Sequence, residues 1–281
     1  MIVPNRTQTP EAVAAHYNEL DRFYREVWGE HVHHGLWHTG RETPAEAVEQ
    51  LVHFLAGELG LAEGQAGCDV GCGYGASAEL LAREYGVRVA GVTISQAQFE
   101  RASQRAVSVP GLEFQCRDWL ENTFAAASFD AVYAIESTEH MVGRQRFFDE
   151  AFRTLRPGGR LAVYAWLSCP EPRPWQVRRL LEPICREGRL AGMGTAAEYR
   201  VMAEAAGFEW LAEHQLSRQV AKTWSICIRR FLGKLASDLS YLKFMFDRRR
   251  SERIFALTVV RILAAYRLGA MQYALLVARK P

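Results

Sequence analysis

The sequence predicts an α/β protein whose core is a doubly wound sheet of seven strands. Short apolar runs with the composition of strands alternate with amphipathic runs of helical spacing. This alternation produces parallel sheets with helices on both faces. A turn with three glycines follows the first strand, and polar residues follow the ends of several others. Ligands bind beyond the carboxyl ends of strands in such sheets, so we expect the functional site at that edge.

The strands and helices follow from local composition. The first strand ends at Asp69, and an amphipathic helix is expected from Ser77 to Tyr85. Six further strands are expected at residues 87–92, 112–116, 129–135, 160–166, 208–214 and 271–278. Helices are expected between them at residues 95–106, 144–155 and 196–206. Ser95 is a favourable helix cap, and Gly207 is a favourable residue after a helix end.

Residues 1–60 are expected to form a helical segment that covers the ligand. Apolar and aromatic residues recur at helical intervals from Pro10 to Val27, which predicts one helix. Thr43 and Glu46 form a capping box around Pro44, so a second helix begins there. The loop between these helices, residues 28–37, is expected to lie over the glycine turn.

The remaining segments divide into a core and a region on the substrate side. We expect residues 61–167 to form the ligand-binding core and residues 168–268 to contain the sixth strand and a helical cap. Residues 168–190 are expected to be a connection rich in proline and arginine, and the cap is expected to contain two or three helices. Residues 269–281 supply the last strand. Arg248-Arg249-Arg250 could meet a diphosphate, but Asp247 and Glu252 beside them favour a solvated face.

Bulk composition excludes several classes of function. The 281 residues carry a net charge of +2, which gives no field suited to nucleic acid. No apolar run approaches the roughly 18 residues of a membrane helix. The six cysteines form no CxxC pair and no signal peptide precedes them, as expected of reduced thiols in a cytoplasmic protein. Four histidines lie within His31–His38, but without a nearby carboxylate or thiol at ligand spacing we expect no metal.

The glycine turn predicts a nucleotide-like ligand. Gly71, Gly73 and Gly75 permit positive φ and a close backbone approach, and the following helix aims free N–H groups at a ligand. A dinucleotide site needs an acid at the end of the next strand, where this sequence has Thr93. NAD is therefore disfavoured.

Five segments resemble the tocopherol C-methyltransferase-like family of class I S-adenosylmethionine-dependent methyltransferases. They are Trp28-Gly-Glu-His-Val-His-His-Gly35, the glycine turn, Gly91-Val-Thr-Ile-Ser95 with Gln98, Ile135-Glu-Ser-Thr-Glu-His-Met141 and residues 272–281. The resemblance covers nearly the whole chain and extends to sterol C-methyltransferases, cyclopropane-fatty-acid synthases and bacterial prenyl C-methyltransferases. It implies a Rossmann-like methyltransferase fold, with S-adenosylmethionine as methyl donor and S-adenosylhomocysteine as product.

The resemblance also assigns expected contacts to the donor. Asp69 would accept from its ammonium group or fix the loop through backbone amides, and Thr93 and Gln98 would bind the ribose. Asp118 would bind the adenine amino group, with a solvated turn acid as the less favoured alternative. Trp119 would donate its backbone N–H to the ring. The full expected set is Tyr17, Trp28, His33, Asp69, Gly71, Gly73, Gly75, Thr93, Ile94, Gln98, Asp118, Trp119 and Ile135. Tyr17, Tyr24 and Trp28 could hold the sulfonium by cation–π attraction or could be ordinary core aromatics, and His33 or His34 could be structural.

The expected catalytic residues are Glu136, Glu139 and His140, which follow the fourth strand. Two carboxylates and an imidazole suit general-base work, and Glu136 at the strand tip is the favoured base. Glu139 could instead be an acid favoured by a helix N-terminus.

The expected acceptor is small and lipophilic, with carbon as the favoured methylated atom. Aromatic residues of the substrate-side region could line its pocket or simply pack between helices: Trp210, Trp224, Phe231, Tyr241, Phe244 and Phe246. N- or O-methylation of a small natural product is the alternative activity. A catalytically silent protein that binds S-adenosylmethionine also stays open, as does a homo-oligomer.

Overall fold

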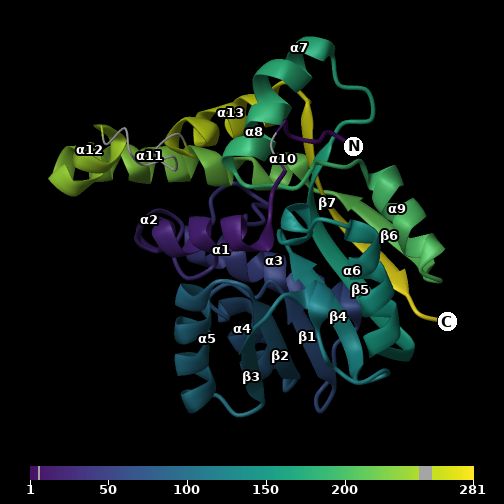
Figure 1. Ribbon diagram of the computed structural model, residues 1–281. Coiled ribbons are helices and arrows are strands. Elements are labelled where there is room, and N and C mark those ends of the chain that lie inside the picture. Colours follow the sequence, from purple (N-terminus) through teal and green to yellow (C-terminus); the bar gives the residue numbers. More distant parts are fainter. Residues whose placement is uncertain (6, 247–254) are drawn as a thin grey trace.

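A seven-stranded mixed sheet forms the centre of the computed structural model, which describes residues 1–5, 7–246 and 255–281 (Figure 1). Its strands are β1 (Ala66–Val70), β2 (Arg88–Thr93), β3 (Leu112–Cys116), β4 (Phe129–Ile135), β5 (Leu155–Ser168), β6 (Glu209–Gln215) and β7 (Met271–Arg279). The sheet order is β3-β2-β1-β4-β5-β7-β6. β1, β2 and β3 proceed outward in one direction, and β4 and β5 in the other, followed by β7 and β6. This order confirms the doubly wound fold and places the switch point between β1 and β4.

The last strand departs from the parallel arrangement that the alternation predicted. β7 lies between β5 and β6 and runs antiparallel to both. β6 ends at the edge of the sheet where the cap helices begin, and those helices stay at that edge (Figure 1). The chain therefore starts β7 from the carboxyl edge, so Met271 pairs with Ser168 at the end of β5.

Helices cover both faces of the sheet. One face packs against α3 (Pro44–Leu59), α4 (Ala76–Tyr85) and α5 (Gln96–Ser108), and the other against α6 (Arg144–Thr154) and α9 (Ala196–Ala205). Two 3₁₀ turns follow strand ends: η1 (Trp119–Glu121) and η2 (Thr138–His140). None of the described helices is both long and apolar enough to span a bilayer.

The N-terminal helix predicted at residues 10–27 is two helices. α1 (Pro10–Glu19) and α2 (Asp21–Val27) meet at Leu20, whose φ of −94° and ψ of 8° are not helical. The Asp21 carboxylate accepts a hydrogen bond from the Tyr74 hydroxyl at 2.9 Å. This contact fixes the start of α2 over the glycine turn, which a continuous helix could not cover in the same way.

Two further segments contain more helix than expected. The predicted connection at residues 168–190 contains α7 (Pro174–Gln176), the π-helical η3 (Val177–Leu181) and α8 (Glu182–Glu187). The cap consists, in its described residues, of α10 (Ser217–Val220), α11 (Lys222–Ser237), α12 (Leu239–Phe246) and α13 (Phe255–Arg267). Figure 1 shows α11, α12 and α13 across the carboxyl edge of the sheet. Arg248-Arg249-Arg250 lie outside the described residues.

The three glycines of the turn have left-handed backbones for different reasons. Gly71 has φ +80°, and a Cβ there would lie 2.3 Å from the Ser137 Cβ. Gly73 has φ +54° and open space around its missing side chain. Gly75 has φ +76°, and a Cβ would lie 2.7 Å from the Phe114 ring. Gly71 and Gly75 therefore allow Ser137 and the Phe114 ring to approach the turn closely, whereas Gly73 leaves space open beside it.

Gly75→Ala should lower the free energy of unfolding more than Gly64→Ala. Gly64 has φ +81° with no atom within 4 Å of an added Cβ, so both changes strain the backbone and only the first also overlaps Phe114. We expect Gly75→Ala to destabilise the fold by about 1–3 kcal/mol more than the control, measured by chemical denaturation. Equal losses would contradict the packing role.

Candidate active site

A cleft lies over the carboxyl ends of β1, β2 and β4, at the switch point. It brings together nine of the predicted donor-binding residues: Tyr17, Gly71, Gly73, Thr93, Ile94, Gln98, Asp118, Trp119 and Ile135. Glu136 and His140 also line it. Residues from α1, the glycine turn and three successive strand ends therefore share one cavity, which we name the donor cleft.

Asp69 lies in a recess beside the donor cleft. The recess is lined by Asp69 and His33 together with Gly71, Gly73 and Ser77. The Asp69 side chain is almost fully buried, and burial raises its pKa to about 7. A cation placed in the recess would stabilise the ionised form, so this carboxyl suits the ammonium group of an amino acid.

The His33 ring is held by both of its nitrogens. Nδ1 donates to the His34 carbonyl oxygen at 2.7 Å, and Nε2 lies 3.1 Å from the Ser77 hydroxyl. Burial lowers the pKa of His33, so the ring is a neutral wall of the recess. No group of three or more His, Cys, Asp or Glu side chains within the described residues is arranged to hold a metal ion.

Polar side chains near β2 and β3 shape the far end of the cleft. The Thr93 hydroxyl donates to the Gln98 amide oxygen at 2.8 Å, so the Gln98 amide is oriented beside the cleft. Asn18 of α1 accepts hydrogen bonds from the Ser95 hydroxyl and the Ala97 N–H. This α1–α5 contact was not predicted, because nothing in the sequence spacing connects positions so far apart. Asp118 accepts from the Leu120 N–H at 2.9 Å and caps η1.

Two residues predicted to contact the donor line neither the donor cleft nor the recess beside it, and a third can offer only its backbone to a ligand there. Gly75 does not line the cleft or the recess, because its missing side chain faces Phe114. Trp28 lines a second cavity instead of the donor cleft. The Trp119 ring packs against Phe124 and Phe147, which leaves its backbone as the part suited to a ligand.

The second cavity, which we name the acceptor chamber, adjoins the donor cleft. Its lining residues are Tyr17, Tyr24, Trp28, Val32, Glu136, Glu139, His140, Trp166, Gly188, Leu190 and Trp224. Four of them also line the donor cleft: Tyr17, Val32, Glu136 and His140. These shared residues form the boundary between the two cavities.

Glu136 at the tip of β4 is a fully engaged carboxylate. Oε1 accepts from the His34 N–H at 2.8 Å, from His34 Nδ1 at 2.9 Å and from the Tyr273 hydroxyl at 2.7 Å. Oε2 accepts from the Trp166 indole N–H at 2.8 Å. Burial alone would raise the pKa of Glu136, but the adjacent His34 and His33 and the hydrogen bonds from the His34 ring and backbone lower it to about 2. A carboxylate with so little proton affinity is a weak base.

His34 connects Glu136 to the cap, because its ring contacts both Glu136 and Trp224 of α11. The Trp224 indole N–H lies 2.6 Å from His34 Nε2. An indole nitrogen only donates, so Nε2 accepts and the ring proton lies on Nδ1, facing Glu136. Loop 28–37 is held further by Thr223, whose hydroxyl accepts from the Gly35 N–H and from the Trp37 indole. The loop is thus attached to both β4 and α11.

Glu139 lies in a different environment although it is only three residues away. Its side chain accepts from the Trp166 backbone N–H and contacts the Thr138 hydroxyl at 3.4 Å. Burial raises the pKa of Glu139 to about 7, against the opposing effect of the Trp166 hydrogen bond. Glu139 therefore exchanges a proton near neutral pH, as a general base requires.

His140 completes the boundary between the two cavities. Nδ1 donates to the Arg189 carbonyl oxygen at 3.0 Å, so Nε2 accepts from the Tyr17 hydroxyl at 2.9 Å. Burial lowers the pKa of His140 to about 4. Burial also raises the pKa of the Tyr17 hydroxyl, and the nearby carboxylates of Glu139 and Glu136 raise it further. The pair is therefore a neutral phenol donating to a neutral imidazole.

Most of the aromatic residues predicted for the acceptor pocket lie outside the chamber, and only Trp224 lines it. Phe231 and Tyr241 pack on the Phe23 ring of α2, and Phe244 lines a surface groove between α2 and α12. Phe246 is 79% exposed, and Trp210 on β6 contacts Arg200. Instead, the chamber uses Trp28 and Trp166, and Tyr273 and Tyr266 lie behind it around His34.

Comparisons with known proteins agree with this geometry. A family model described as mycolic acid cyclopropane synthetase matches residues 5–252. The 27-O-demethylrifamycin SV methyltransferase of Amycolatopsis mediterranei is 33% identical over 281 residues, covering 97% of this chain and 98% of the relative. The chloroplastic tocopherol O-methyltransferase of Arabidopsis thaliana is 27% identical over 298 residues, covering 96% of this chain and 82% of the relative.

A solved structure shows the same fold. Mycolic acid cyclopropane synthase CmaA1, complexed with SAH and CTAB, matches with a TM-score of 0.85 and 21% identity. The match covers 98% of this chain and 99% of that chain. Together with the two relatives, it confirms the resemblance to methyltransferases that the motifs indicated.

Affinity for S-adenosylhomocysteine should rise with pH between 6 and 8. Asp69, with its pKa raised to about 7, is half protonated near neutrality, and an ammonium ligand binds its ionised form. A rise of roughly tenfold corresponds to about one unit of pKa lowering on binding, and calorimetry at several pH values measures it. Asp118→Asn should keep the rise and Asp69→Asn should lose it, whereas a flat wild-type profile would contradict the assignment.

Proposed function

Because the chain belongs to the mycolic acid cyclopropane synthetase family and is an S-adenosylmethionine-dependent methyltransferase, we propose that it methylates a small lipophilic acceptor. The acceptor class is an isoprenoid or aromatic natural product, and carbon is the favoured atom. One observation carries the proposal. The donor cleft and the acceptor chamber share Tyr17, Glu136 and His140, so an acceptor in the chamber can face a donor in the cleft.

The residues of the cleft fit the four parts of S-adenosylmethionine. Asp69 and the open backbone at Gly73 suit the amino-acid end, and Gln98, oriented by Thr93, suits the ribose. Asp118 also lines the cleft, and its carboxylate suits the adenine amino group. Tyr17 lines both the cleft and the chamber and stacks on Tyr24 with ring centroids 5.2 Å apart, so the aromatic ring of Tyr17 suits a sulfonium at this boundary by cation–π attraction. When bound, S-adenosylmethionine would supply the activated methyl group.

We assign the base to Glu139 and an electrostatic role to Glu136. Methyl addition to an alkene or aromatic carbon leaves a cation, which must lose a proton. Glu139 lines the chamber and has a pKa raised to about 7, so its ionised form can accept that proton near neutral pH. Glu136 stays ionised because its pKa is about 2, and its fixed negative charge stabilises positive charge in the chamber. Tyr17 and His140 exclude water at the boundary.

The acceptor must displace side chains when it enters. The chamber encloses about 40 Å³, well below the roughly 300–1,000 Å³ typical of small-molecule sites. Loop 28–37 and α11 form one wall, and Trp28 and Trp224 meet there edge to face at 5.2 Å. Movement of these two rings is the simplest way to enlarge the chamber, because both belong to segments outside the sheet.

O-methylation is the second candidate. The two relatives described above cover almost the whole chain and act, by their names, on oxygen. Glu139 could equally take the proton of a hydroxyl or phenol as its oxygen gains the methyl.

All six cysteines are free thiols, which is consistent with a reaction in the cytoplasm.

Incubation with labelled S-adenosylmethionine and a chosen set of acceptors tests the activity. The set contains 27-O-demethylrifamycin SV, a tocopherol precursor, geranyl diphosphate and a primary amine. Mass spectrometry detects a gain of one methyl, and NMR distinguishes a carbon-bound from an oxygen- or nitrogen-bound methyl. Labelled product with a lipophilic acceptor supports the proposal. Transfer to the amine alone would overturn the acceptor class, and donor binding with no transfer to any acceptor of the set would support a silent protein.

Glu139→Gln should reduce methyl transfer much more than donor binding. Loss of a general base lowers kcat by about 10²–10⁴-fold, while the Kd for S-adenosylhomocysteine should stay within about threefold because Glu139 does not line the donor cleft. The wild-type kcat should rise with pH through about 7 as Glu139 ionises. Glu121→Gln on the exposed η1 turn is the matched control. Full activity in Glu139→Gln would remove Glu139 from the role.

A further inference from the structure

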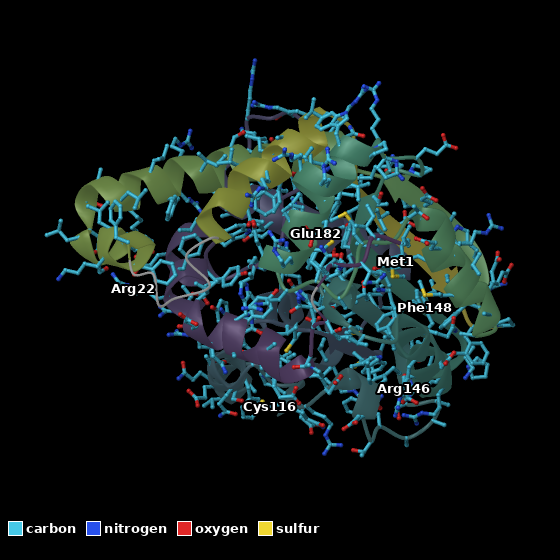
Figure 2. The ribbon with its side chains drawn as sticks, turned by 45° about the horizontal axis from the view of Figure 1, so that its top comes forward. Met1, Arg22, Cys116, Arg146, Phe148 and Glu182 are labelled. Atoms are coloured by element: carbon cyan, nitrogen blue, oxygen red, sulfur yellow. The ribbon has the colours of Figure 1, made fainter. Side chains whose placement is uncertain are left out.

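Arg144 is a buried arginine at the start of α6. Only 4% of its surface is exposed, whereas Arg146, two residues later on the same helix, is exposed (Figure 2). Charged side chains are rarely buried so completely unless they are held by specific partners. The partners that hold this guanidinium must therefore lie inside the protein, not on the exposed face of α6.

The guanidinium donates to backbone carbonyls of two separate segments. Nε donates to the Thr138 carbonyl oxygen at 3.0 Å, and Nη2 donates to those of Gly192 at 2.8 Å and Glu139 at 3.4 Å. The Tyr199 ring lies beneath the charge at 5.2 Å. Three carbonyl dipoles and an aromatic face thus stabilise the cation, and the η2 turn is joined to residues 188–194.

The same two segments make further contacts around the catalytic residues. The Ala191 N–H donates to the Glu139 carbonyl oxygen at 2.7 Å, and His140 Nδ1 donates to the Arg189 carbonyl oxygen at 3.0 Å. Arg189 has a left-handed backbone with φ 58°. Both the backbone of Glu139 and the ring of His140 therefore depend on how residues 188–194 are held against η2.

We infer that Arg144 is a positioning residue for methyl transfer, which locks η2 to residues 188–194 and places a fixed positive charge beside the base Glu139. This inference rests on the proposed function, because it concerns how that reaction's base is held. Arg144 lines neither the donor cleft nor the acceptor chamber. It acts through Glu139 and His140 and does not touch the reacting atoms.

The charge of Arg144 acts on a carboxyl that several groups surround. Burial raises the pKa of Glu139, the Trp166 N–H and Arg144 lower it, and Glu136 raises it. The other titratable groups facing Glu139 from packed elements are Tyr17 of α1, Cys185 of α8, Tyr199 of α9 and Tyr266 of α13. Burial raises the pKa of each of these four groups. Arg144 therefore stands out as the positive charge in this set.

Carbon-13 NMR of glutamate side chains tests the charge effect without any acceptor. The complex with S-adenosylhomocysteine is titrated, and Glu139→Gln assigns the signal. Arg144→Met should raise the titration midpoint of Glu139 by about one unit or more, whereas Arg144→Lys should leave it near the wild-type value. The exposed control Arg146→Met should also leave it unchanged. An unchanged midpoint in Arg144→Met would overturn the charge role, and Arg144→Gln serves the same comparison if Arg144→Met does not fold.

The pH profile of methyl transfer tests the positioning role. Arg144→Lys keeps the charge but not the planar three-carbonyl contact, so kcat should fall by roughly tenfold or more with little change in donor affinity. In Arg144→Met the rise of kcat with pH should also move to higher pH. A wild-type kcat in Arg144→Lys would overturn the positioning role. Full turnover in Glu139→Gln would instead refute the proposed base while leaving the NMR shift intact.

Discussion

The active site depends on one buried carboxylate, that of Glu136. Its two oxygens accept four hydrogen bonds from three separate segments: loop 28–37, β5 and β7. The side chain is only 6% exposed, so an unpaired charge there would be strongly unfavourable. Glu136 also has a left-handed backbone with φ 56°, a strained conformation that persists only where the surroundings impose it. The loop over the site, the wall of the chamber and the last strand thus converge on this group.

The two carboxylates of the site illustrate how environment divides similar groups between roles. Glu136 and Glu139 are only three residues apart, yet His34, His33 and the hydrogen bonds from His34 lower the pKa of the first to about 2 while burial raises that of the second to about 7. Sites that need a fixed charge and an exchangeable proton commonly separate their pKa values in this way. The sequence shows only two glutamates near a histidine, so it could not distinguish a charged anchor from a base.

Features that depend on local sequence were predictable, and features that depend on distant pairing were not. The glycine turn, the strand ends and the polar residues after them follow from periodicity and composition, and together they position the donor cleft. The direction of β7 was not predictable, because it depends on the cap staying at one edge of the sheet. The roles of Trp166 and Tyr273 were missed because each lies 30 or more residues from Glu136 in the chain. The aromatic residues of the cap were mostly misplaced, since helical spacing does not show which face a helix turns toward a site.

We propose that the donor cleft and the acceptor chamber meet at Tyr17 and His140, which line both cavities. The most direct measurement is a crystal structure of the protein with S-adenosylhomocysteine, in which the position of the sulfur atom is determined. We expect the sulfur at the shared boundary, next to Tyr17 and His140 and facing the chamber, with the amino-acid end beside Asp69. A sulfur directed away from the chamber, or a donor bound outside the cleft, would contradict it.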